Sequence, residues 1–386
     1  GNNNLSNNDV LFNDYSNGDY RLSDYSPAIG AGTATGAPTT DIDGNPRPNP
    51  EGSNPDMGAY ENDNDTPLHN SLIHVNTTGN DSGTVGLSAA PFKTIQAGID
   101  YAADGDTVLV AAGTYTENVS LNKSIVLMSS ESADSTIIDA NNFGTVVTIT
   151  DGSDATLDGF TLQNGYTSGS NTKSGGLIVL NNDAVIKNCI IKNNQGHQGG
   201  GIYTEGGSFY NCQVLNNTGE FEGGGIFTFG NNQLFENCLI ANNHCGSGAG
   251  IAWGPIRLVN TTVVNNTGGY GIASAGTSTI TNSIIYGNDG DEIGSFTATV
   301  TNSLVEGGYT GTGNIDSDPL FADATNGDYS LSDYSPAIGA GTATGAPSTD
   351  IDGNPRPNPA GSSPDMGAYE NDNDTPLHNS LIHVNT

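Results

Sequence analysis

Acidic side chains beside glycine turns are the residues of this sequence with the clearest capacity for chemistry. They lie in two stretches, and the second repeats the first 309 residues later. Carboxylate oxygens are hard ligands that suit Ca²⁺. The spacing departs from the full EF-hand pattern, and Asp-Gly-Asn is also ordinary turn chemistry. A structural calcium site and a plain turn therefore both remain interpretations, and no other cofactor is predicted. The eight candidate ligands are Asp41, Asp43, Asp56, Glu61, Asp350, Asp352, Asp365 and Glu370.

Cysteines form a second group of chemically interesting residues. Cys189, Cys212 and Cys238 occupy equivalent places in successive short repeats, and small polar residues take the same place in later repeats. Their spacing does not match a zinc site. Side chains on stacked strands point in parallel, which disfavours a disulfide. The pattern favours a stack of small buried side chains over a metal site or a disulfide.

Aromatic residues follow several glycine clusters. Tyr203, Phe227 and Trp253 fall at equivalent places after these clusters. Such rings could stack against sugars, and core packing or stacking along one face of the fold explains the same pattern. Both interpretations stand.

These residues belong to a short internal repeat. Six Asn-Cys, Asn-Thr or Asn-Ser dipeptides are separated by 23, 26, 23, 22 and 20 residues, and most precede two apolar residues and a further asparagine. A period of this length is typical of a β-solenoid. Coils stacked about 4.8 Å apart would bring the asparagines into a ladder of side-chain amides. The predicted ladder consists of Asn188, Asn211, Asn237, Asn260, Asn282 and Asn302.

Composition agrees with a thin, turn-rich fold. Only 34% of the residues are hydrophobic, whereas 54 of the 386 are glycine. Residues 90–106 have the spacing of a short amphipathic helix followed by a turn, which predicts a cap for the solenoid. We expect coils over residues 107–305 and a terminal segment over residues 314–370.

Charge narrows the range of partners. The formal charge of −33 disfavours nucleic acid, which requires Lys and Arg against phosphate. It also disfavours anionic membrane surfaces and suits a self-repelling surface protein. No run of 18 apolar residues predicts a membrane span, and the chain does not open with a signal peptide.

A long repeat organises the chain. Residues 17–77 recur at 326–386 with four differences. We predict a window on a tandem array: the end of one unit at 1–62, a linker and junction strand at 63–75, a complete unit at 76–370 and a junction at 371–386. The alternative is a single protein with duplicated ends for head-to-tail assembly. Both interpretations predict self-association through adjacent units or subunits.

Two sets of motifs resemble a known family. APFKTIQA at residues 90–97, GDTV at 105–108 and GTYTENV at 113–119 resemble the opening of secreted bacterial pectin-lyase-like right-handed β-helices. DPLF at 318–321, SPAIGAG at 335–341, DIDGNPR at 350–356 and PDMGAYE at 364–370 are similar to the choice-of-anchor Q segment. The resemblance implies an all-β, right-handed parallel β-helix and a location outside the cell or on its surface.

Active-site motifs of that family are missing. Its pectate lyases use an arginine beside calcium-binding acids, but Arg257 stands alone here. The sequence also lacks the Asp-Asp, Gly-His-Gly and Arg-x-Lys motifs of related hydrolases. Four glutamates that could share one face have no basic partner in sequence and are interpreted as a solvated rim: Glu205, Glu220, Glu222 and Glu236. We assign no catalytic residue and predict a protein that is not an enzyme.

Two functional hypotheses follow. The first is an extracellular structural or adhesive protein whose tandem β-helix units form a surface fibre or long adhesin. The alternative is a β-helix module that binds or cleaves polysaccharide, with glycans as partners.

Overall fold

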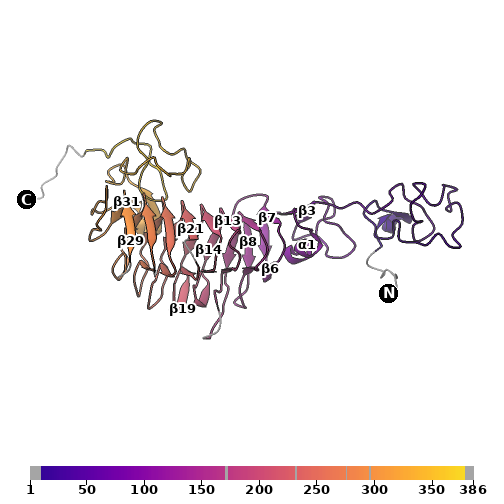
Figure 1. Ribbon diagram of the computed structural model, residues 1–386, viewed down its shortest axis with the longest axis horizontal. Coiled ribbons are helices and arrows are strands. Elements are labelled where there is room, and N and C mark those ends of the chain that lie inside the picture. The colour runs from indigo at the N-terminus through magenta and orange to yellow at the C-terminus, as the bar shows by residue number, and fades with distance from the viewer. Residues whose placement is uncertain (1–9, 170–172, 231–232, 275, 295–296, 379–386) are drawn as a thin grey trace, which may run out of the picture. The chain divides into compact units, whose positions relative to one another are not determined.

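The computed structural model describes residues 10–169, 173–230, 233–274, 276–294 and 297–378. The chain divides into two compact units, residues 1–111 and 112–386 (Figure 1). This division does not test the predicted boundaries at residues 62, 75 and 370, which stay predictions.

Three parallel sheets form the body of the second unit, and Figure 1 shows their strands stacked coil upon coil. The first sheet contains β7 (Val126–Ser129), β10 (Thr156–Asp158), β13 (Val185–Lys187), β17 (Ser208–Tyr210), β21 (Gln233–Glu236), β24 (Ile256–Val259), β27 (Ser278–Thr281) and β29 (Ala298–Thr301). The second contains β5 (Gly113–Tyr115), β8 (Thr136–Asp139), β11 (Thr161–Gln163), β14 (Ile190–Lys192), β18 (Gln213–Leu215), β22 (Leu239–Ala241), β25 (Thr262–Val264), β28 (Ile284–Tyr286) and β30 (Leu304–Val305). The third contains β6 (Val119–Leu121), β9 (Val147–Ile149), β12 (Leu177–Val179), β16 (Ile202–Thr204), β20 (Ile226–Thr228), β23 (Ile251–Trp253) and β26 (Ile272–Ser274). The predicted all-β parallel solenoid is confirmed, with about 8 turns.

Most strands have three or four residues, so each coil contributes only one or two side chains per strand to the core. In the first sheet, register places Ile186, Phe209, Phe235, Leu258 and Ile280 directly above one another. All five are buried. The rings of Phe209 and Phe235 stack with centroids 4.7 Å apart. Burial of this apolar row along the axis supplies the hydrophobic stabilisation that one coil alone could not.

The six predicted ladder asparagines all lie at one corner of the coils with left-handed φ between 46° and 54°. Asparagine tolerates this conformation better than other residues with side chains. Nδ2 of Asn211 donates to Oδ1 of Asn188 at 3.1 Å, and Nδ2 of Asn237 donates to Oδ1 of Asn211 at 3.2 Å. Asn282 donates to Asn260 in the same way at 3.2 Å. The Asn260 amide instead donates to the carbonyl of Asp365 at 3.0 Å.

A second row of asparagines makes the continuous, buried ladder. From the second member onward, each Oδ1 accepts both the backbone N–H and the Nδ2–H of the member one coil earlier, at 2.8–3.1 Å. Each Nδ2 also donates to a strand carbonyl at 2.9–3.1 Å. The ladder therefore follows the second asparagine of each repeat rather than the predicted first one. Its members are Asn194, Asn217, Asn243, Asn266 and Asn288.

The three stacked cysteines are buried, and their thiols are free. Each Sγ points to a strand carbonyl, as when Cys212 approaches the carbonyl of Ile186 at 3.6 Å. Thr261, one coil beyond Cys238, directs its hydroxyl to the carbonyl of Phe235 at 3.1 Å. Burial raises the pKa of the Cys189 and Cys212 thiols well above its usual value. The thiols therefore stay protonated and serve as small packing groups.

The first unit contains a small antiparallel hairpin and one helix. Strand β1 (Phe12–Asp14), the 3₁₀ turn η1 (Tyr15–Asn17) and strand β2 (Asp19–Leu22) form the hairpin. Helix α1 (Ile95–Tyr101) starts at the N-cap Thr94 and buries Ile95 and Ile99. It packs against the parallel pair β3 (Leu72–Val75) and β4 (Thr107–Val110). The predicted helical segment at residues 90–106 therefore contains a helix of 7 residues.

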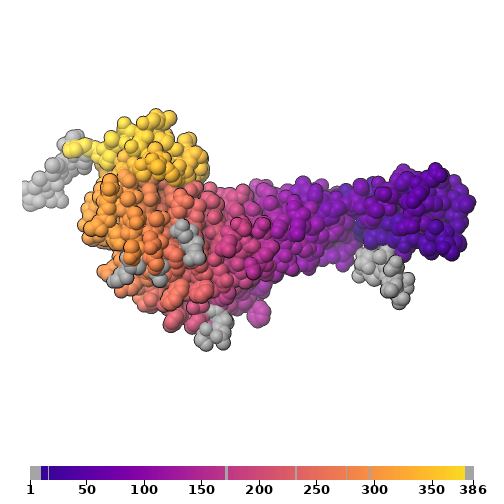
Figure 2. All heavy atoms as spheres, in the orientation of Figure 1, coloured from indigo at the N-terminus to yellow at the C-terminus, as the bar shows by residue number. Residues whose placement is uncertain are grey.

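The terminal segment after the last coil folds back onto the solenoid. It opens with β31 (Phe321–Asp323), η2 (Ala324–Asn326) and β32 (Asp328–Leu331), which repeat the hairpin of the first unit. Figure 2 shows this yellow segment seated on the orange coils. Two short strands, β15 (Gln195–Gln198) and β19 (Thr218–Glu222), form a separate parallel pair in the central coils.

Removing one rung of the buried ladder should destabilise the protein strongly. Asn217→Ala deletes four hydrogen bonds of a fully buried side chain and leaves the N–H of Asn194 without its acceptor. We expect a loss of about 3 kcal/mol or more in unfolding free energy, measured by denaturant titration. The exposed neighbour Asn216 also has left-handed φ, so Asn216→Gly should leave stability nearly unchanged. Equal effects of the two variants would contradict a stabilising role of the ladder.

Candidate functional site

One candidate site is a row of aromatic rings on the outer face of the third sheet. Tyr203 of β16 and Phe227 of β20 are register partners, and their rings stack with centroids 5.6 Å apart. Trp253 continues the stack at 6.1 Å from Phe227. The three rings differ in exposure, at 5%, 2% and 46% respectively. Trp253 alone presents a ring face to solvent, so Tyr203 and Phe227 act as its support rather than as sugar contacts of their own.

Trp253 reaches this face through an unusual backbone conformation. Its register partners Thr228 and Ser274 are both buried in neighbouring coils. A φ of 86° at Trp253 turns the indole out onto the ring of Phe227 instead. Positive φ is a strained state for a bulky residue, and such strain persists only where the surroundings enforce it. Here the next residue, Gly254, is held by both neighbouring coils. Its N–H donates to the Thr228 carbonyl at 2.9 Å, and the Gly254 carbonyl accepts the Ser274 hydroxyl at 2.6 Å.

Polar groups border the aromatic row. Nζ of Lys173 lies 4.3 Å from the centre of the Tyr203 ring and 2.8 Å from Oε1 of Glu205. The Tyr203 hydroxyl donates to the same oxygen at 3.0 Å, and burial together with this carboxylate raises the pKa of Tyr203. Contrary to the sequence interpretation, Glu205 thus has a basic partner. These groups offer donors and acceptors beside an exposed indole.

The other predicted rim glutamates lie on β19 and β21, whereas Glu205 follows β16. Glu220 lies on β19, 3.6 Å from Nδ1 of His197, whose ring stacks on Phe221. Glu236 lies on β21, in the first sheet rather than beside Glu205. The four glutamates therefore do not form one acidic face.

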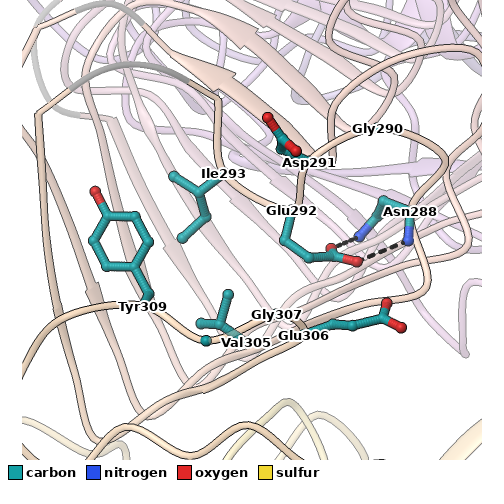
Figure 3. Close-up of a pocket in the computed structure, with 10 residues that line it drawn as sticks. Asn288, Gly290, Asp291, Glu292, Ile293, Val305, Glu306, Gly307 and Tyr309 are labelled. Carbon is teal, nitrogen blue, oxygen red and sulfur yellow. Dashed lines mark hydrogen bonds between the residues drawn. The ribbon is translucent and has the colours of Figure 1, made fainter.

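A second candidate site is a cavity of about 470 Å³ at the last coils (Figure 3). Three carboxyl groups line it, those of Asp291, Glu292 and Glu306, together with the half-buried Tyr309. Glu292 is 7% exposed, whereas Glu306 is exposed. Oε1 of Glu292 accepts the backbone N–H of Asn288 at 3.0 Å, and Oε2 accepts its side-chain amide. Glu292 thus takes the place of the next rung of the buried ladder.

The environments of the Glu292 and Glu306 carboxyls differ. Burial, with a smaller effect of the neighbouring Glu306 carboxyl, raises the pKa of Glu292 to about 7 against the hydrogen bonds from Asn288, which lower it. Glu306 accepts the N–H of Gly287 at 2.9 Å from the exposed side. A carboxyl whose pKa is raised, next to a second carboxyl, is an arrangement that general acid–base chemistry uses. The sequence offered one signal for this site: Gly308 stands where the register predicts another ladder asparagine.

The predicted calcium ligands are engaged by hydrogen-bond donors. Oδ1 of Asp41 accepts the N–H groups of Asp43 and Asn45 at 2.9 and 2.8 Å, and Asp350 repeats this arrangement. Asp56 and Asp365 likewise accept two backbone N–H bonds each. Glu61 pairs with Arg47 and Glu370 with Arg356, while Asp43 pairs with Arg21.

No group of three or more acidic, His or Cys side chains in the described part of the chain is placed to hold a metal ion. Carboxylates filled by N–H donors and guanidinium groups do not fit a calcium cage. Calcium therefore has no part in the function proposed below. Asp352, whose pKa burial raises, is the remaining predicted ligand.

Comparisons with known proteins agree with this fold. The family model of the right handed beta helix region matches residues 145–307. Pectate lyase Pel9A is 17% identical, with 78% of this chain and 97% of that chain covered and a TM-score of 0.47. Pectin methylesterase PemA from Erwinia chrysanthemi is 15% identical, with 64% and 81% covered and a TM-score of 0.37. A rhamnogalacturonan lyase is 17% identical, with 61% and 68% covered and a TM-score of 0.37.

No curated protein matches the sequence. At these identities the structural likeness concerns the fold alone. The prediction that the chain is not an enzyme is nevertheless contradicted, because the similar solved structures are a methylesterase and two lyases. In the described residues, no helix has the length and apolar character needed to cross a membrane.

The raised pKa of Glu292 makes stability depend on pH. An acid with a pKa of about 7 in the folded chain, against an ordinary value of 4.5, binds its proton more tightly when the chain is folded. Its stabilising contribution is present below pH 4.5 and is lost as pH rises through 7. We expect the melting temperature to fall between pH 4.5 and pH 8, and Glu292→Gln to reduce that fall. Asp291→Asn, which removes an exposed charge from the same cavity, should leave the slope nearly as in the parent protein. If Glu292→Gln leaves the slope unchanged, the carboxyl does not titrate as described.

Proposed function

We propose that this chain is a polysaccharide-active β-helix module that binds an extended polysaccharide through the surface around Trp253. The observation that carries the proposal is the exposed indole, held by a strained backbone on a stack of two covered rings. A flat, rigid aromatic face packs against the C–H face of a sugar ring at low entropic cost. Lys173 and Glu205 lie along the same row and can exchange hydrogen bonds with sugar hydroxyls.

The charge of the protein favours a neutral polysaccharide. At −33, the chain repels polyanionic chains at low ionic strength. Action outside the cell is part of the proposal, and it is supported by the resemblance of residues 90–119 to secreted β-helices. The comparisons favour this function over the fibre or adhesin hypothesis, because the similar structures are polysaccharide-processing enzymes.

Trp253→Ala tests the binding surface. We expect the parent protein to be retarded in native gels that contain a neutral polysaccharide such as xylan or galactan, and less by polygalacturonate. The substitution should weaken binding at least about ten-fold, which corresponds to about 1.4 kcal/mol. Phe143→Ala, which removes an aromatic ring that is 78% exposed elsewhere, is the matched control. Equal retardation of parent and Trp253→Ala, or no retardation of the parent in any gel, would reject the proposal.

A second candidate function, cleavage of a glycosidic bond, is favoured by the carboxyl pair at Glu292 and Glu306. Glu292 would protonate the leaving oxygen as the glycosidic C–O bond breaks, while a water molecule attacks the sugar carbon and gives its proton to Glu306, as in glycoside hydrolysis with inversion. The position of Glu292 at the end of the ladder fixes its carboxyl before a substrate arrives. This reaction needs the raised pKa, since an ordinary glutamate is ionised at neutral pH.

Release of reducing ends from polysaccharide measures this activity. We expect Glu292→Gln and Glu306→Gln each to lower the rate about 100-fold or more, because each removes one proton-transfer group. Glu131→Gln changes an exposed carboxylate on another coil and should have no effect. Absence of cleavage by the parent protein over a broad set of polysaccharides would rule the second function out and leave the binding proposal standing.

A further inference from the structure

The chain carries two copies of one docking segment. We call residues 17–69 the first segment and residues 326–378 the second segment. Each follows a 3₁₀ turn and contains the second hairpin strand, β2 or β32. Each also contains the carboxylate-centred turn, at Asp41 or Asp350, where the hydrogen-bond lengths agree within 0.1 Å. Near-identical sequence therefore gives the same local structure twice.

The second segment is docked on the outer face of the coils through apolar contacts. Leu331, Ala337, Ile338 and Met366 are buried in one cluster with Ile284 and Leu304 of the solenoid. Tyr329 is buried in a neighbouring cluster with Leu239 and Val264. Tyr329 and Met366 are more deeply buried here than their counterparts Tyr20 and Met57, so their burial supplies a hydrophobic contribution that comes from docking.

Hydrogen bonds fix the position of the second segment on the coils. The Tyr329 hydroxyl donates to Oδ1 of Asn242 at 2.9 Å and accepts Nδ2 of Asn265 at 3.1 Å. Asn282 exchanges two bonds of 2.8 Å with the backbone of Thr342. Ala368 N–H donates to the Thr262 hydroxyl at 3.0 Å. Corner asparagines of the solenoid thus form a specific receptor for the segment.

The first segment presents only part of this docking surface to solvent, because Leu22, Ala28 and Ile29, the counterparts of Leu331, Ala337 and Ile338, are buried within the segment itself. Tyr20 is 49% exposed, whereas its counterpart Tyr329 is 2% exposed. Met57 is half-buried and Ala59 exposed, whereas Met366 and Ala368 are fully buried.

None of the four sequence differences between the copies falls on a docking residue. The residues that contact the coils are identical in both copies. The differing pairs are Arg21/Ser330, Thr39/Ser348, Glu51/Ala360 and Asn54/Ser363.

We propose that the first segment docks onto the outer face of a second β-helix of this kind, the one that precedes it in a tandem polypeptide. The occupant follows from the second segment, which has the same docking residues and already binds such a face. In a tandem chain each segment would cover the last coils of the unit before it. The receptor on that unit is the set of positions equivalent to Asn242, Asn265 and Asn282, with the apolar positions equivalent to Ile284 and Leu304.

Full-length variants test whether the first segment binds this receptor. Tyr329→Ala/Met366→Ala weakens docking of the second segment and leaves the coil face free for the first segment of another molecule. We expect the parent protein to be monomeric and this variant to associate with rising concentration, reaching two or more chain masses in light scattering after size exclusion. Adding Tyr20→Ala/Met57→Ala should return it to the monomer mass. Tyr20→Ala/Met57→Ala alone should remain monomeric and keep the circular dichroism spectrum of the parent protein.

Two results would overturn the proposal. The first is a folded Tyr329→Ala/Met366→Ala variant that stays monomeric at all concentrations. The second is association that persists after Tyr20→Ala/Met57→Ala, which would mean that the freed coil face is merely adhesive. Circular dichroism decides whether the variant retains its sheets. If it does not, Tyr329→Phe replaces it, because this change removes both hydroxyl hydrogen bonds and keeps the ring.

Discussion

Hydrogen bonds along the stacking direction are the interactions on which the rest of this structure depends. Three parallel sheets connect each coil to the next through the backbone, but a chain that turns a corner leaves N–H groups without a strand partner. The buried asparagines resolve this at one corner, because each Oδ1 accepts both the N–H and the amide of the asparagine one coil earlier. A chain with 34% hydrophobic residues has a thin core, so satisfied polar corners decide whether its coils stack.

This constraint also determines where chemistry can occur. Inward positions are committed to the stacked core, and ladder positions are committed to neighbouring coils. Both candidate sites are departures from the repeat: Trp253 turns outward from a register position that is buried in adjacent coils, and Glu292 fills a rung where the next coil has Gly308. A residue that breaks the repeat is freed from its stacking role and can be selected for function.

The sequence predicted what repeats and missed what departs from the repeat. Spacing of the Asn-Cys, Asn-Thr and Asn-Ser dipeptides was enough for the solenoid, because a period of about 20 to 26 residues leaves few alternatives. It could not choose which asparagine of each repeat faces inward, since asparagines stand at both ends of the same short strand. Sequence spacing also grouped Tyr203 and Phe227 with Trp253, although only the backbone at Trp253 decides which ring is exposed. Glu292 was missed because it follows Asp289, Gly290 and Asp291, and such an acidic, glycine-containing stretch predicts a solvent-exposed turn.

The break in the outer asparagine row shows how stacking and docking compete for the same groups. Where the corner is not covered by the second segment, Asn188 and Asn211 bond to each other. Where the segment covers it, Asn260 donates to the carbonyl of Asp365, and Asn237 adds a bond of 2.7 Å to the carbonyl of Thr349. The side-chain amide of an outer asparagine has two N–H donors, which can bond to a neighbour in the same row or to a partner outside the solenoid. The inner ladder keeps the coils stacked in either case, which leaves the outer row available as a binding surface.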